Sequence, residues 1–103
     1  MANLLSTNPI YIDTFTSAID LADYLPPEIH LNSIEWSRPT STDHYAIIFS
    51  GGASGTTVFE EQCIIANQSI IKYFHGLPIK PPYIPAVSSN LMGSGKIIIV
   101  MGR

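Results

Sequence analysis

The chain has 103 residues, which gives room for one hydrophobic core, and we expect a single domain over residues 1–103. Hydrophobic residues make up 46% of the chain and charged residues only 13%, whereas soluble domains average about 25% charged residues. The net charge of −3 argues against a nucleic-acid partner, the short apolar runs argue against a membrane, and the single cysteine excludes an intrachain disulfide. The N-terminus lacks a signal-peptide pattern, so we expect synthesis in a cytoplasm.

The two signs of charge are separated along the chain. All eight acidic residues lie between Asp13 and Glu61 with one basic residue, and every charge after Glu61 is basic. We expect strands from the two halves to interleave within a sheet. Head-to-tail contacts between subunits are the alternative.

The first elements are a short strand and an ambiguous segment. Residues 10–12 are β-branched or aromatic, which predicts a strand. Residues 16–25 fit one short helix or an irregular loop, because Ser17 and Asp20 resemble a capping box and a proline pair follows.

A longer strand and a hairpin are predicted next. The apolar positions of residues 28–36 change parity, which indicates a bulge near residues 32–33. Residues 43–49 alternate in hydrophobicity, the glycine-rich segment 51–55 suits a hairpin loop, and residues 56–66 form the expected return strand.

The last third combines two strands with a proline-rich segment. Residues 69–74 favour a strand, and residues 97–101 are apolar on both parities, which predicts a strand covered on both faces, one of them by another subunit. The prolines within residues 76–90 predict an extended arm or long loop. Six or so short strands between turns indicate an all-β fold, either a β-sandwich or a Greek-key barrel, with at most one short helix.

No motif carries a catalytic or cofactor-binding signature. The segments 51–55 and 93–96 are rich in glycine but precede strands, which is unlike a phosphate-binding loop. Glu60 and Glu61 would point to opposite faces of a strand and so cannot act as a catalytic pair. We therefore expect a protein that is not an enzyme and that uses no cofactor.

The histidines leave one alternative open. His30, His44 and His75 lack the spacing of a metal motif, yet they could converge in space with Cys63 or Asp43. We expect no metal site and place Cys63 in the core. An enzyme would need Asp43, His44 or His75 to meet in a concave pocket.

Aromatic residues and prolines remain as candidates for an interface. We expect Trp36 and Phe74 in the core, because large aromatic side chains dominate small cores. Aromatic anchors beside preformed extended segments suit contact with a neighbour at low entropic cost. The expected interface residues, with Tyr83 first among them, are Tyr73, Pro78, Pro81, Pro82, Tyr83, Ile84 and Pro85.

Three segments resemble small virion proteins of tailed bacteriophages, of the β-sandwich cement or decoration type. They are Asn8-Pro9-Ile10-Tyr11-Ile12-Asp13-Thr14, Ile34-Glu35-Trp36 and Ser94-Gly95-Lys96-Ile97-Ile98-Ile99. The resemblance implies many copies on the capsid surface of a virion, a dimer or trimer of the chain, the major capsid protein as a partner, and no catalytic residues. The proline-rich arm and residues 16–25 depart from this pattern.

Two other classes of function are compatible with the same composition. A neck, tail or fibre component of a virion would also have its apolar surface covered by neighbours. A free β-sandwich module could bind carbohydrate or peptide through Trp36, Tyr73 or Tyr83 as stacking platforms.

Overall fold

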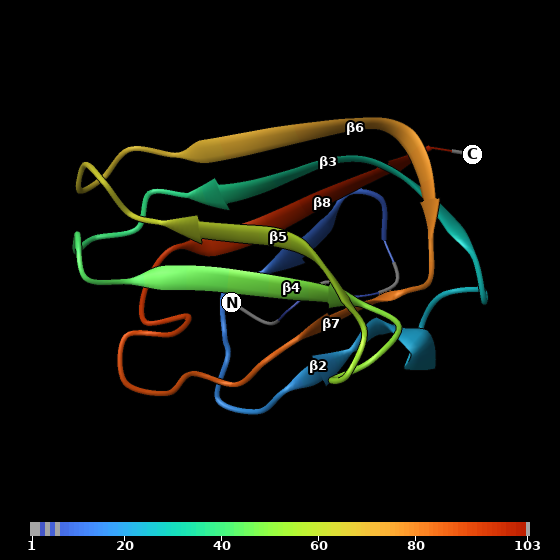
Figure 1. The fold of residues 1–103 in the computed structure, drawn as a ribbon, viewed down its shortest axis with the longest axis horizontal. Coiled ribbons are helices and arrows are strands. Elements are labelled where there is room, and N and C mark those ends of the chain that lie inside the picture. Colours follow the sequence, from blue (N-terminus) through green and yellow to red (C-terminus); the bar gives the residue numbers. More distant parts are fainter. Residues whose placement is uncertain (1–2, 4, 6, 103) are drawn as a thin grey trace.

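The computed structural model describes residues 3, 5 and 7–102 and shows two stacked antiparallel sheets (Figure 1). Sheet A has the strand order β1-β8-β3-β6, and sheet B has the order β2-β7-β4-β5. The all-β prediction is confirmed, in the form of a sandwich. The elements are β1 (Ile10–Ile12), β2 (Ile19–Asp20), the 3-10 turn η1 (Leu21–Asp23), β3 (Ile29–Ser37), β4 (Tyr45–Ser50), β5 (Thr56–Gln62), β6 (Ile70–Ile79), β7 (Pro82–Ile84) and β8 (Lys96–Gly102).

Strands from the acidic and basic halves of the chain interleave, as predicted. In sheet A, β1 and β3 come from the first half and alternate with β8 and β6 from the second. The charges themselves are not opposite one another, because Glu35 of β3 lies between Ile98 of β8 and Ile71 of β6. The interleaving therefore results from the pairing of apolar strands.

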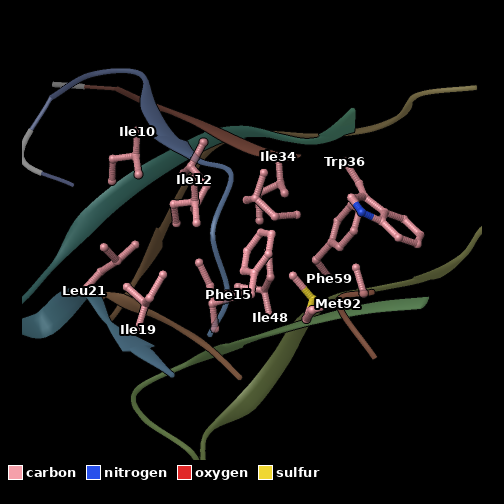
Figure 2. Packing of buried hydrophobic residues seen from close by; sticks show 14 of the residues in the cluster. Ile10, Ile12, Phe15, Ile19, Leu21, Ile34, Trp36, Ile48, Phe59 and Met92 are labelled. Atoms are coloured by element: carbon pink, nitrogen blue, oxygen red, sulfur yellow. The ribbon is translucent and has the colours of Figure 1, made fainter. Parts of the chain in front are cut away.

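The core lies between the two sheets. Alternate residues of each strand point inward, so that Ile34 and Trp36 of β3 meet Ile48 of β4 and Phe59 of β5 (Figure 2). Trp36 is fully buried, as predicted, and its indole Nε1 donates a hydrogen bond of 2.9 Å to the carbonyl of Ser94. The predicted core positions of Cys63 and Phe74 also hold, although Phe74 is only partly buried.

Two local predictions are confirmed with adjusted limits. The register of β3 shifts between Leu31 and Ser33, which is the predicted bulge. The hairpin of β4 and β5 forms around the glycine-rich loop, but β5 ends at Gln62 and does not reach residue 66. The amide of Cys63 still donates to the carbonyl of His44 at 2.9 Å, and the chain then turns toward β6.

The ambiguous segment 16–25 forms a two-residue strand followed by a single helical turn. Asp20 caps this turn, since its Oδ1 accepts a hydrogen bond of 3.0 Å from the amide of Ala22. In the described part of the chain, no helix is long and apolar enough to cross a membrane.

The prediction of an extended arm or long loop over residues 76–90 is wrong for residues 76–79 and 82–84, which lie in β6 and β7. Strand β6 continues through Pro78 to Ile79, which is possible because β6 is an edge strand and an edge tolerates the missing amide of a proline. Pro82 begins β7, and β7 pairs with β2 and β4 inside sheet B. The segment therefore links the two sheets.

Candidate docking faces

The predicted interface residues do not form one surface. The side chains of Pro81, Pro82 and Ile84 are buried inside the protein's own sandwich, so they are not available to a partner and this part of the prediction is wrong. Pro78 is exposed on β6, and Pro85 is half-buried beyond β7. Burial of the prolines follows from the pairing of β7 within sheet B, which brings that segment into the core.

The two tyrosines of the predicted interface lie on opposite faces of the sandwich. Tyr73 of β6 is 65% exposed and pairs with Ser33, which faces away from the core of sheet A. Tyr83 of β7 is half-buried on the outer side of sheet B, where its ring centroid lies 6.5 Å from that of Phe49. A single partner contacting one face would meet only one of these tyrosines.

The outer face of sheet A is largely apolar. Because Ile34 and Trp36 of β3 point into the core, their alternating neighbours Ser33 and Glu35 point outward. Strand pairing extends these two positions into transverse rows across the sheet. One row is Tyr11, Ile98, Glu35 and Ile71, and the other is Val100, Ser33 and Tyr73.

The side chains of this face remain accessible. Ile71 is 47% exposed, and the outward side chains of β8, Ile98 and Val100, are half-buried by their neighbours within the sheet. The one described helical turn, η1, packs against β7 of the other sheet. No described helix or strand therefore covers the outer face of sheet A, so the second cover predicted for β8 is not supplied by these elements.

The outer face of sheet B has the same character. Tyr45, Ile47 and Phe49 of β4 alternate with core residues and point outward, beside Tyr83 of β7. Antiparallel sandwiches commonly place polar residues at these positions. The low charge content of the chain is thus explained by its outer faces, which carry apolar and aromatic side chains where charges are usual.

A lysine lies at the border of the outer face of sheet A. The Nζ atom of Lys96 is 5.7 Å from the ring centroid of Tyr11. The Tyr11 side chain and, to a smaller extent, the Asp13 carboxylate raise the pKa of Lys96 above its usual value.

The histidines do not come together. His44 instead meets Ser94, with 2.6 Å between Nδ1 and Oγ, and the same Oγ accepts a hydrogen bond from the amide of Thr40. In residues 3, 5 and 7–102, no three His, Cys, Asp or Glu side chains are grouped so that they could hold a metal ion. The contact joins residues 50 positions apart, and no sequence pattern indicates it.

The polar contacts around Ser94 fix a loop. Its backbone carbonyl accepts from Trp36, and its hydroxyl contacts both His44 and Thr40, so the bend before β8 is attached to the start of β4. Hydrogen bonds that satisfy all these groups stabilise the loop.

Comparison with known proteins adds no family to this description. The chain matches no protein-family model, no curated protein and no solved structure.

Proposed function

We propose that the chain is a structural subunit of a tailed-bacteriophage virion and that it docks on the head shell as a cement or decoration protein. The observation that supports the proposal best is the apolar outer face of sheet A, formed by Tyr11, Ile71, Tyr73, Ile98 and Val100. Exposed apolar patches of this kind mark protein–protein contact sites. The resemblance of three segments to small virion proteins gives the class of partner.

The geometry of the face suits docking on a broad protein surface. A strand pair holds its outward side chains at fixed spacing, so that little side-chain entropy is lost when a partner covers them. Tyr11 and Tyr73 lie on the two edge strands of sheet A, and their hydroxyl groups can make hydrogen bonds with a partner. The major capsid protein is the proposed partner.

The alternative of a carbohydrate-binding module is less well supported. Trp36 is fully buried and cannot stack on a sugar, and Tyr83 is half-buried beside Phe49. A hollow of about 420 Å³ beside the β4–β5 hairpin is lined by Gly51, Gly52 and Lys80 among others, without an aromatic side chain. Of the three suggested platforms, only Tyr73 is open to solvent.

Binding to head shells tests the proposal. The purified chain is mixed with assembled shells of the encoding phage that lack it, and the pelleted protein is quantified. We expect saturable binding with a copy number that scales with the number of capsomers. Binding in a few copies at one vertex would replace the head-surface role by a neck or tail role, and no binding at any concentration would contradict a virion role.

A further inference from the structure

The two sides of the sandwich differ in the length of their edge strands. On one side, sheets A and B end in β1 and β2, which have three and two residues. On the other side they end in β6 and β5, which have ten and seven residues. Short edge strands protect a sheet against further pairing, and long ones are templates for it. We call the side formed by β5 and β6 the open side.

The two edge strands of the open side, β5 and β6, run in opposite directions (Figure 1). Glu61 and Gln62 of β5 line one hollow together with Ile70 of β6, and Val58 of β5 lines another with Leu77 of β6. Both edges therefore belong to one continuous surface. Each strand pairs on its inner side only, and its outward edge is not paired with another described strand.

The charges on the two edges are opposite in sign. Strand β5 carries Glu60 and Glu61, and strand β6 carries Lys72. The Nζ atom of Lys72 lies 5.4 Å from the centroid of the Phe74 ring, and none of the three charged groups forms an ion pair with a described residue. The edge of each sheet thus has the charge that would attract the edge of the other sheet.

We propose that the open side binds a second copy of this chain, with β5 of each copy alongside β6 of the other. A two-fold axis parallel to the strands produces this arrangement, because it exchanges the two sheets and keeps the strand direction. Each β5 then runs antiparallel to the β6 of its neighbour, so that both sheets continue across the dimer. The positive φ angles of His75 and Gly76 interrupt β6, so its regular part, residues 70–74, offers about five residues at about 3.4 Å each, or roughly 17 Å of contact on each sheet.

Charge favours this arrangement over its main rival. If the two-fold axis were perpendicular to the sheets, β6 would pair with β6 and β5 with β5. Strand β5, which carries Glu60 and Glu61, would then lie beside another β5, and strand β6, which carries Lys72, would lie beside another β6. Like charges at an interface are unfavourable, whereas the crossed arrangement places glutamate strands beside lysine strands.

The loop between β5 and β6 supports the same axis independently. Ile64 and Ile65 in this loop are 73% and 60% exposed, and both line a hollow with Ile70. An axis parallel to the strands leaves this loop at the same end of both copies, where the two loops meet and cover their isoleucines. The perpendicular axis would move the loops to opposite ends and leave these side chains in water.

Sedimentation equilibrium of the purified chain tests the proposal without any shell present. The interface is at the lower end of specific interfaces, about 1,000 Å² in total, so we expect a dimer with a Kd on the order of micromolar that weakens at high salt. Lys72→Glu should raise the Kd about tenfold or more, because it places like charges on both contacts. Lys96→Glu, with the same change in charge outside the open side, should leave the Kd unchanged.

A variant in which all three charges are reversed tests whether β5 of one copy pairs with β6 of the other. The variant Glu60→Lys/Glu61→Lys/Lys72→Glu should dimerise like the original chain, because both contacts are again complementary. The proposal would be overturned if the original chain is a monomer at all concentrations. It would also be overturned if the Lys72→Glu and Lys96→Glu variants have the same dimer Kd. Ile64→Ser/Ile65→Ser should also weaken the dimer, and it replaces Lys72→Glu if the melting temperature shows that the latter does not fold. If the original chain is monomeric at all concentrations but still binds shells, this inference is overturned and the proposed function is not.

Discussion

At the scale of single residues, the clearest constraint is the contact between Gly95 and Trp36. Gly95 has a φ of +81°, and a Cβ placed on it would lie 2.6 Å from the Nε1 of Trp36 and 2.9 Å from the carbonyl oxygen of Ser37. The same indole donates to the carbonyl of Ser94. Glycine is therefore required both for the backbone conformation and for the space in which the buried indole makes its hydrogen bond.

Gly95→Ala is expected to lower the free energy of unfolding by about 3 kcal/mol, from the left-handed backbone and from overpacking together. Gly52 provides the matched control, since its φ is +97° and nothing lies within 4 Å of a Cβ there. Gly52→Ala should cost only about 1 kcal/mol. Urea unfolding of both variants measures the difference, and equal losses would show that the contact with Trp36 is unimportant.

At the scale of elements, sequence patterns predicted features of β3 and β4 correctly but misjudged the segment that forms the end of β6 and β7. The parity change in β3 and the alternation of β4 are local patterns, so the bulge and the hairpin were predictable. Residues 76–90 were misjudged because a proline prevents a central strand but not an edge strand or a first strand position, and strand order depends on distant pairing. Pro78 lies in an edge strand and Pro82 begins β7.

Inner and outer positions of sheet A should respond differently to substitution. Ile71→Thr/Tyr73→Thr changes exposed side chains of an edge strand, so the free energy of unfolding should change by no more than about 1 kcal/mol. Ile99→Ala removes a fully buried side chain of a central strand and should cost about 2–5 kcal/mol. Thermal or urea unfolding checks both values, and a large loss in the outer-face variant would mean that this face packs within the chain.

At the scale of the whole molecule, the sandwich follows from composition and pattern, but its interface does not. The count of short strands predicted the fold class, and the excess of apolar residues predicted uncovered surface. The positions of that surface could not be predicted, because inward and outward faces of an apolar strand look alike in sequence. Ile98 and Ile99 are adjacent and similar, yet only the pairing with β3 shows which one faces outward.

One core between two sheets also predicts the unfolding behaviour. The radius of gyration of 12.5 Å agrees with about 13 Å for a compact domain of this length. Calorimetry at low protein concentration should therefore show one transition, with equal calorimetric and van't Hoff enthalpies. Two separate transitions would contradict the single domain.

Co-sedimentation with head shells tests the central claim, that the outer face of sheet A docks on a larger assembly, most directly. The original chain should pellet with shells in a saturable manner, and the folded Ile71→Thr/Tyr73→Thr variant should pellet much less. Asp23→Lys, an exposed change in η1, which packs against β7 of sheet B, should bind like the original chain. Equal binding of the original and outer-face variants, or no binding of either, would contradict the claim.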